Sequence, residues 1–232
     1  MQLPVHREGL PIIAGFLLAT ALLWFLWAPL GLLGGVLSGW CIWFFRDPNR
    51  VPPDTSGVIL APADGRLLPI VEMPPPAELA MGNAPRIRIS IFMNIFNVHV
   101  NRIPADGTII DTHYRPGRFF NASFDKASEH NERLSARMRL DTGEELAFVQ
   151  IAGLIARRIR STLGRGETVH RGARFGLIRF GSRVDVYLPP DAEVCVSEGQ
   201  HMTAGETVIA RLGGRNAPVA PGSSDSDEGT AR

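Results

Sequence analysis

The stretch that decides the fold is FGLIRFGSRVDVYLPP, residues 175–190. Hydrophobic residues alternate there with polar and small ones, and this period of two is typical of β-strands. Gly181 interrupts the alternation, and a glycine inside a strand usually marks a bend, a bulge or a close backbone approach. We therefore expect two strands that join or kink at Phe180-Gly181-Ser182.

The same Gly-Ser pair also has a chemical interpretation. A serine hydroxyl that follows a freely twisting glycine peptide can attack the carbonyl in front of it. A simple bend explains the pair as well, and Gly222-Ser223 near the C-terminus is a second copy. The chemical interpretation therefore requires a base, an acid and a substrate from the rest of the chain.

Composition excludes several classes of function. The 232 residues carry a net charge of only +1, which argues against a nucleic-acid binder. Lys126 is the only lysine, so 23 of the 24 basic residues are arginines. Arginine suits phosphate and carboxylate recognition, although a GC-rich coding bias explains the excess equally well. Cys41, Cys195 and the six histidines form no ligand pattern, so no disulfide framework and no metal site is predicted.

The N-terminal segment is apolar, with no charged residue between Glu8 and Arg46. Pro29 and Gly31 divide it into 12–27 and 30–45, each about 24 Å long as a helix and shorter than the ~20 residues of a full span. All four tryptophans lie here, and positive charge flanks both outer ends. We predict that residues 1–46 form a membrane-associated helical hairpin with both ends on the cytoplasmic face, and not a cleaved signal peptide.

The remainder is predicted to be a soluble, β-rich catalytic domain over residues 47–212, with a disordered tail over 213–232. It opens with a proline-rich linker. Asp-Gly pairs predict turns at 64–65 and 106–107, and the first pair predicts a hairpin between two strands of residues 58–73. The strongest strand signal covers 86–100, and a hairpin is expected to turn at 141–143.

A weak internal repeat refines this prediction. GETVHRG at 166–172 matches GQHMTAG at 199–205, and each precedes an apolar strand. Together with APADG at 61–65, the pattern looks like the hairpins of lipoyl- and biotinyl-type β-sandwiches. The expected fold is therefore mainly β, a barrel-sandwich-like soluble domain preceded by an apolar helical hairpin.

Three features have a structural and a functional interpretation. Asp64 is either a turn residue or a catalytic acid, and His99 is either a packed histidine or a base. The arginines that follow the 141–143 hairpin form either a solvated edge or a patch that faces lipid headgroups; they are Arg157, Arg158, Arg160 and Arg165.

Taken together, the motifs resemble the phosphatidylserine decarboxylase family, in its short, membrane-associated branch. The resemblance covers nearly the whole chain and rests on the apolar hairpin, APADG with Asp64, FNVHVNRIP with His99, KASEHNER at 126–133 and FGS with Ser182. It implies a proenzyme that cuts itself between Gly181 and Ser182. The β chain would be 1–181, and the α chain, 182–232, would begin with a pyruvoyl cofactor made from the serine.

The resemblance also implies roles and partners. Asp64, His99 and Ser182 would form a triad in which a carboxylate orients the imidazole that takes the serine proton. The enzyme would convert phosphatidylserine to phosphatidylethanolamine and CO₂ at the cytoplasmic face of the cell membrane. Its partners would be this substrate, anionic membrane lipid and its own two chains as a heterodimer.

One residue departs from the family pattern. Longer members carry an additional histidine three positions before the triad histidine, where this chain has Phe96. Phenylalanine donates no proton, so the proton donor of the decarboxylation is open, with His99, His113 and water as candidates. The alternative functions are a membrane-tethered barrel-sandwich module that binds without catalysis and a pyruvoyl decarboxylase of a soluble amino acid.

Overall fold

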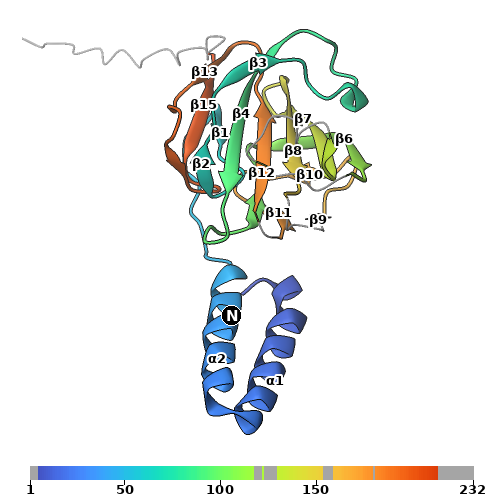
Figure 1. Ribbon diagram of the computed structural model, residues 1–232. Coiled ribbons are helices and arrows are strands. Elements are labelled where there is room, and N and C mark those ends of the chain that lie inside the picture. Colours follow the sequence, from blue (N-terminus) through green and yellow to red (C-terminus); the bar gives the residue numbers. More distant parts are fainter. Residues whose placement is uncertain (1–4, 118–121, 123–129, 154–158, 180, 214–232) are drawn as a thin grey trace, which may run out of the picture.

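The computed structural model describes residues 5–117, 122, 130–153, 159–179 and 181–213. Two antiparallel helices project from one end of a β-rich domain (Figure 1). A 3₁₀ turn, η1 (Arg7–Gly9), leads into α1 (Leu10–Leu26), and α2 (Ala28–Phe44) follows. Residues 126–129 of the KASEHNER motif and residues 214–232 of the predicted tail lie outside the described residues. Arg157 and Arg158 do so as well.

The helix pair confirms the predicted hairpin and corrects its dividing point. Trp27, with φ −164° and ψ 120°, is the extended residue that separates the helices. Pro29 lies in the first turn of α2, where its missing N–H leaves no helical hydrogen bond unmade, so it begins a helix instead of breaking one. The segment Arg7–Leu26 is long and apolar enough to cross a membrane by length and composition, whereas α2 is shorter.

Most of the domain is β-structure, as predicted. A nine-stranded sheet has the order β10-β6-β7-β8-β12-β4-β2-β14, with β3 beside β4; two three-stranded sheets have the orders β1-β15-β13 and β5-β11-β9. A short 3₁₀ turn, η2, covers Ala77–Leu79. The strands are β1 (Val58–Leu60), β2 (Gly65–Leu67), β3 (Val71–Met73), β4 (Arg86–Met93), β5 (Val100–Arg102), β6 (Gly107–Arg115), β7 (Arg133–Leu140), β8 (Glu145–Ile151), β9 (Ile159–Ser161), β10 (Thr168–Val169), β11 (Arg174–Ile178), β12 (Ser182–Tyr187), β13 (Ala192–Val194), β14 (His201–Met202) and β15 (Val208–Leu212).

Strand β12 is the centre of the large sheet. It pairs antiparallel with β4 on one side and with β8 on the other, and all of its residues are buried. The chain leaves β11 in the small sheet and enters β12 in the large one, with Gly181 at φ +61° between them. This change of sheet at Gly181 confirms the predicted kink. Glycine suits the position because it takes a positive φ without strain.

The internal repeat is also confirmed, and it builds two matching corners. Gly205 N–H donates to Ala61 O at 2.8 Å, and Gly172 N–H donates to Ile103 O at 2.8 Å. We name the first the Asp64 corner (residues 61–65 with 204–205) and the second the Asp106 corner (residues 103–107 with 171–172). The corners exchange backbone bonds reciprocally: Leu60 N–H to Pro104 O at 2.7 Å, and Arg102 N–H to Pro62 O at 2.8 Å.

Two local predictions are wrong. Asp64-Gly65 does not close a hairpin, because β1 pairs with β15 while β2 pairs with β4 and β14. A Cβ at Gly65 would meet Phe92 O at 2.2 Å, so the glycine permits close strand approach. The 86–100 stretch is not one strand, since β4 ends at Met93 and β5 begins at Val100. The hairpin of β7 and β8 forms as predicted.

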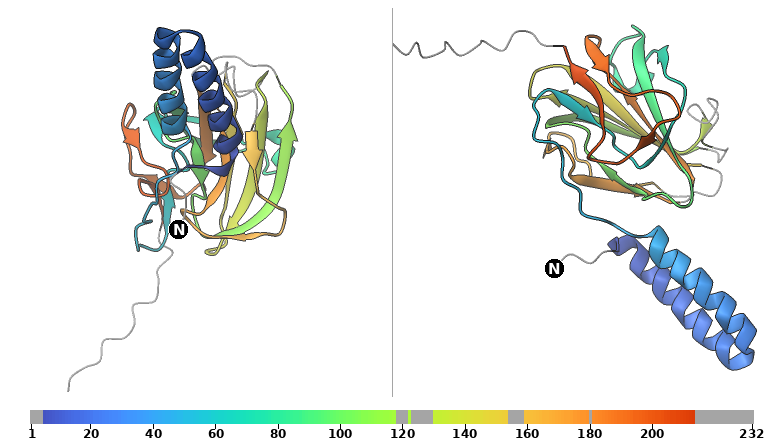
Figure 2. Two further views of the ribbon diagram at one scale, coloured as in Figure 1. Left: turned by 90° about the horizontal axis from the view of Figure 1, so that it is seen from below. Right: turned by 90° about the vertical axis from the view of Figure 1, so that its left-hand side faces the viewer.

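The proline-rich linker is tied to the domain by ion pairs. Asp47 contacts Arg174 at 2.7 Å and Arg102 at 3.5 Å, and Arg50 contacts Asp64 at 2.9 Å. The base of the helix pair packs on the domain as well, in an apolar cluster that includes Phe44, Phe45, Val98, Val100 and Leu177. Figure 2 shows the helices meeting the domain at this end only.

Candidate functional site

Ser182 is the first residue of β12 and is completely buried. It pairs with Met93, the last residue of β4, and its Oγ lies 3.9 Å from Met93 Sδ. A thioether is a weak acceptor, so this contact leaves the hydroxyl poorly stabilised. Gly181 directly precedes it in the left-handed conformation.

His99 lies in the connection from β4 to β5 and is also completely buried. Its Nδ1 lies 3.0 Å from Asn97 O, and its ring centroid lies 4.3 Å from that of Phe44. Because a carbonyl oxygen only accepts, Nδ1 carries the proton and Nε2 is the free acceptor. Nε2 has no hydrogen-bond partner among the described residues. Burial, with a smaller effect of Arg46, lowers the pKa of His99 to about 4 and keeps the imidazole neutral.

Asp64 lies immediately before β2, with its side chain 14% exposed. Its carboxylate accepts from Ala204 N–H at 2.8 Å and from Arg50 Nη2 at 2.9 Å. Burial raises the pKa of this carboxyl above its ordinary value, and the Ala204 N–H and the charges of Arg50, Arg46 and Arg102 offset part of the rise.

The strand register brings the three predicted residues to the same end of the sheet. Ser182 lies opposite Met93 on one side of β4, while Arg66, two residues after Asp64, lies opposite Phe92 on the other side. Two strand spacings, about 10 Å, therefore separate the backbones of Asp64 and Ser182. His99 joins this end because its carbonyl accepts from Ile178 N–H at 3.3 Å, four residues before Ser182.

The three side chains do not form a connected triad in this structure. In the described part of the chain, no hydrogen bond joins Asp64, His99 and Ser182 to one another. Asn97 O occupies the Nδ1 side of His99, where a triad carboxylate would bind. The positive charge of Arg46 acts on both Asp64 and His99, so this residue lies in their common surroundings.

Sequence reasoning missed Gly153, which lies against the predicted cleavage site. A Cβ at this position would meet Gly181 O at 1.7 Å, which no side chain can tolerate. The carbonyl that Ser182 would attack is therefore packed on the Cα of Gly153. The only signal in the sequence is a glycine at the end of the apolar strand β8, and many glycines share that feature.

A buried polar chain next to Ser182 was also missed. Gln150 Nε2 donates to Asn101 Oδ1 at 2.7 Å, and Asn101 Nδ2 points at Met93 Sδ at 3.6 Å. Both amides are fully buried, and Met93 contacts both Asn101 and Ser182. This chain fixes the thioether that the serine hydroxyl faces.

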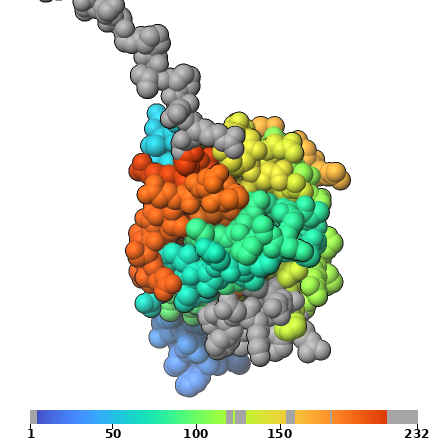
Figure 3. Space-filling model, turned by 90° about the horizontal axis from the view of Figure 1, so that it is seen from above, coloured from blue at the N-terminus to red at the C-terminus, as the bar shows by residue number. Residues whose placement is uncertain are grey.

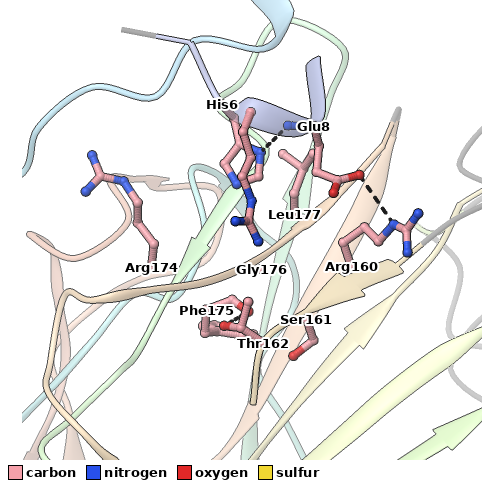
Figure 4. Close-up of a pocket in the computed structure, with 10 residues that line it drawn as sticks. His6, Glu8, Arg160, Ser161, Thr162, Arg174, Phe175, Gly176 and Leu177 are labelled. Atoms are coloured by element: carbon pink, nitrogen blue, oxygen red, sulfur yellow. Dashed lines mark hydrogen bonds and ion pairs between the residues drawn. The ribbon is translucent and has the colours of Figure 1, made fainter. Parts of the chain in front are cut away.

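A separate cavity of about 310 Å³ lies where η1 meets β9 and β11 (Figure 4). It is lined by cationic and polar side chains, among them Arg7, Arg160, Arg174 and His6. Glu8 points into the same space and pairs with Arg160 at 3.4 Å and with Arg179 at 3.2 Å. The cavity lies at the junction of the helix pair and the domain, and it does not include Ser182. In the described residues, no group of three or more His, Cys, Asp or Glu could hold a metal ion.

Comparison with known proteins identifies the family of the chain. The family model described as phosphatidylserine decarboxylase matches residues 37–210. A phosphatidylserine decarboxylase proenzyme of Paramagnetospirillum magneticum is 56% identical over 209 residues, which cover 90% of this chain and 87% of the relative. Proenzymes of the same name from Rickettsia akari and Nitrobacter winogradskyi are 54% and 53% identical, over 90% and 89% of this chain and 90% and 84% of the relatives. The chain belongs to the phosphatidylserine decarboxylase family.

Proposed function

We propose that this protein is a phosphatidylserine decarboxylase, made as a proenzyme that converts phosphatidylserine to phosphatidylethanolamine and CO₂. The observation that carries the proposal is the family match, which spans both the base of the helix pair and the bond between Gly181 and the buried Ser182, at the start of the central strand. A non-catalytic adaptor would have no need for a fully buried serine hydroxyl that, among the described residues, contacts a thioether.

Activation begins with self-cleavage between Gly181 and Ser182. Ser182 Oγ attacks the Gly181 carbonyl carbon, and His99 Nε2 accepts the hydroxyl proton. The peptide C–N bond breaks as His99 passes this proton to the Ser182 nitrogen, and the Gly181 acyl group moves to the serine oxygen as an ester. Loss of the Ser182 α-proton then expels the Gly181 carboxylate, and water releases ammonia from the remaining enamine to leave a pyruvoyl terminus.

The described residues fit these requirements in part. The left-handed φ of Gly181 and its close contact with Gly153 support a scissile carbonyl that is held in one orientation. A neutral His99 with a free Nε2 supports its role as the base. A complete triad requires Asp64 to approach His99 and to replace Asn97 O at Nδ1, so we propose that the bond between Asn97 O and His99 opens before cleavage.

The pyruvoyl group would supply a ketone that accepts the electrons released as CO₂ leaves. The buried, partly apolar surroundings of Ser182 would exclude competing water from that ketone. His99 is our candidate for returning a proton to the product, because Phe96 in the turn before it has no proton to give. Neutral His99 would first take up that proton at Nε2 from the ammonium group of the substrate.

The two processed chains would remain a heterodimer. The α chain, 182–232, would contribute β12, which pairs with β4 and β8 of the β chain, 1–181. It would also contribute β15 and β14, which pair with β1 and β2. Figure 3, which looks from the end opposite the helices, shows the orange C-terminal segment packed against the teal and green segments of the β chain. Cutting one bond leaves these ladders intact.

We further propose that residues 1–46 hold the enzyme on the cytoplasmic face of the membrane, with 47–212 as the catalytic domain. The apolar helix Arg7–Leu26 supports membrane association. The arginines of the cavity in Figure 4 suit the phosphate of an anionic lipid, because a guanidinium binds phosphate through paired hydrogen bonds. Arg7, Arg160 and Arg174 line the cavity at the end of the domain that faces the helix pair, where such a headgroup would lie.

The test is a decarboxylation assay on full-length protein with phosphatidylserine in detergent micelles. We expect CO₂ release from the wild-type chain, none from Ser182→Ala, and none from free serine. A carbonyl-trapping reagent should label only the small chain. Release from free serine would favour the soluble amino-acid decarboxylase, and no release from either substrate would favour the adaptor module.

A further inference from the structure

The connection from β4 to β5 forms a compact, ordered turn with two apolar side chains on its outside. Asn97 N–H donates to Asn94 O at 3.1 Å, and Asn94 N–H donates to Asn97 Oδ1 at 2.9 Å. Phe96 N–H donates to Asn94 Oδ1 at 2.8 Å. These bonds close the turn through its own asparagines, so its shape requires no packing of Ile95 or Phe96.

These two side chains are exposed although they are apolar. Phe96 is 61% exposed and Ile95 is 36% exposed. Single exposed hydrophobic residues are ordinary, whereas two adjacent ones on a turn that needs neither for its shape indicate a contact surface. Outside the helical hairpin and within the described residues, the other large apolar side chains with comparable exposure are Val51 and Tyr114, which are not adjacent to each other in the sequence.

The turn is fastened to the end of α2 by Arg46. Arg46 Nη2 donates to Phe96 O at 2.7 Å, and Nη1 donates to Trp43 O at 2.8 Å. The guanidinium carbon lies 4.2 Å from the centroid of the Trp43 ring, and Trp43 is 55% exposed. Arg46 therefore joins the Trp43 ring to the backbone of Phe96, and Figure 1 shows the connection after β4 directly above the end of α2.

We propose that Ile95 and Phe96 insert into the lipid interface and form, with Trp43 and Arg46, a second membrane contact of the catalytic domain. This inference rests on the proposed membrane attachment of the helix pair, to whose exposed Trp43 the turn is joined through Arg46. The chemistry matches each depth of an interface: indole and benzyl groups enter the headgroup boundary, and a guanidinium binds lipid phosphate. We name the surface formed by Trp43, Arg46, Ile95 and Phe96 the docking turn.

The docking turn also connects the membrane to the site. Asn97, which closes the turn, holds His99 Nδ1 through its carbonyl at 3.0 Å, and Val98 packs into the cluster at the helix base. Insertion would therefore fix the catalytic end of the domain against the lipid surface, where the headgroup of the substrate is presented.

The test measures the depth of a single probe in full-length protein. An environment-sensitive fluorophore is placed on Phe96→Cys in a Cys195→Ser background, because Cys195 is exposed while Cys41 is buried. The matched control is the same label on Val51→Cys, which is 81% exposed and lies in the linker. Both proteins are reconstituted in vesicles of phosphatidylcholine with phosphatidylglycerol, and quenching by lipids with a shallow nitroxide is compared with quenching by aqueous iodide.

We expect the label at 96 to be quenched several-fold more strongly by the nitroxide lipid than the label at 51, and less strongly by iodide. Equal iodide quenching at both positions would overturn the proposal. Protection at 96 without nitroxide quenching, growing with protein density, would show a contact between two copies instead. Repeating the experiment with Ser182→Ala separates this result from the proposed chemistry, because depth is expected to be the same when self-cleavage is absent.

Discussion

The Asp64 corner and the Asp106 corner have the same backbone and different surroundings. Each has a Pro-Ala-Asp-Gly sequence, and each aspartate accepts a backbone N–H from the opposite repeat, Ala204 for Asp64 at 2.8 Å and Arg171 for Asp106 at 3.0 Å. Each glycine lies where a Cβ would meet a strand carbonyl, at 2.2 Å in one corner and 2.1 Å in the other.

The difference lies in burial and in the neighbouring segments. The Asp64 side chain is 14% exposed, at the sheet end that also holds His99 and Ser182, while the Asp106 side chain is 36% exposed and pairs with Arg171 and His170. The aspartate is thus first a structural device of the fold, used twice. The proposed chemistry requires a corner that is buried and that adjoins a serine at a kinked strand start.

The most severe way to break the comparison is to remove each carboxylate in turn. We expect Asp64→Asn to slow self-cleavage about 10³–10⁴-fold, as loss of a triad carboxylate does, because the imidazole loses its orienting charge. Asp106→Asn should process at the wild-type rate. The measurement is the time course of chain splitting on denaturing gels after synthesis.

Both variants keep an oxygen that can accept the corner N–H, so both should fold. Equal slowing in the two variants would mean that the corners act only through the fold. Normal processing of Asp64→Asn would leave Asn97 O as the group that orients His99.

A second test changes Gly153, which packs against the Gly181 carbonyl at the sheet end that holds Asp64. Gly153→Ala should slow self-cleavage about 10²-fold, because the new methyl group displaces the Gly181 carbonyl by roughly 1 Å from the attacking hydroxyl. Gly164→Ala is the matched control, since a Cβ there would lie 3.6 Å from Glu167 Oε2, an ordinary contact. Circular dichroism should show both variants folded. Rapid cleavage of folded Gly153→Ala would show that the close approach has no role in it.

The smallest expected effect is a pH dependence of the free energy of unfolding, which arises from His99 at the sheet end that holds the Asp64 corner. With a pKa of about 4, folded His99 stays neutral at pH 5, whereas the unfolded chain takes up its proton below pH ~6.5. The unfolded state therefore gains stability as the pH falls through this window, and the folded protein loses about 2 kcal/mol between pH 7 and pH 5. Asp64, whose pKa is raised, changes stability in the opposite direction at lower pH.

This dependence can be measured by thermal unfolding in detergent of the Ser182→Ala chain, which unfolds as one polypeptide. Adding His99→Gln should remove most of the difference between pH 7 and pH 5. The control His201→Gln changes an exposed histidine and should leave the difference unchanged. An unaltered difference after His99→Gln would assign it to another group.

The sequence was sufficient for the general architecture because that architecture depends on repeated local patterns. The uncharged N-terminal segment predicts the helix pair, and the repeat of residues 166–172 at 199–205 predicts a β-rich domain with two related halves. The kink at Gly181 follows from a glycine that interrupts an alternating strand. Each of these depends on neighbours in the chain, so periodicity is enough to find it.

What could not be predicted depends on contacts between distant segments. An Asp-Gly pair predicts a hairpin, yet Asp64-Gly65 links different sheets, because pairing with β4 outweighs the local turn preference. Nothing near Gly153 in the sequence indicates that Gly181 packs on it. The 86–100 stretch reads as one strand because its apolar residues continue through the turn. The turn is closed by side-chain bonds of Asn94 and Asn97 that the apolar pattern does not reveal.

The most direct test of the central claim is the intact mass of purified full-length protein, wild type beside Ser182→Ala. We predict that the wild type contains two chains that divide at 181/182, the smaller with a keto terminus lighter than an N-terminal serine, whereas Ser182→Ala remains one 25.3 kDa chain. A wild-type protein that stays whole, or a Ser182→Ala protein that still divides there, would contradict the account.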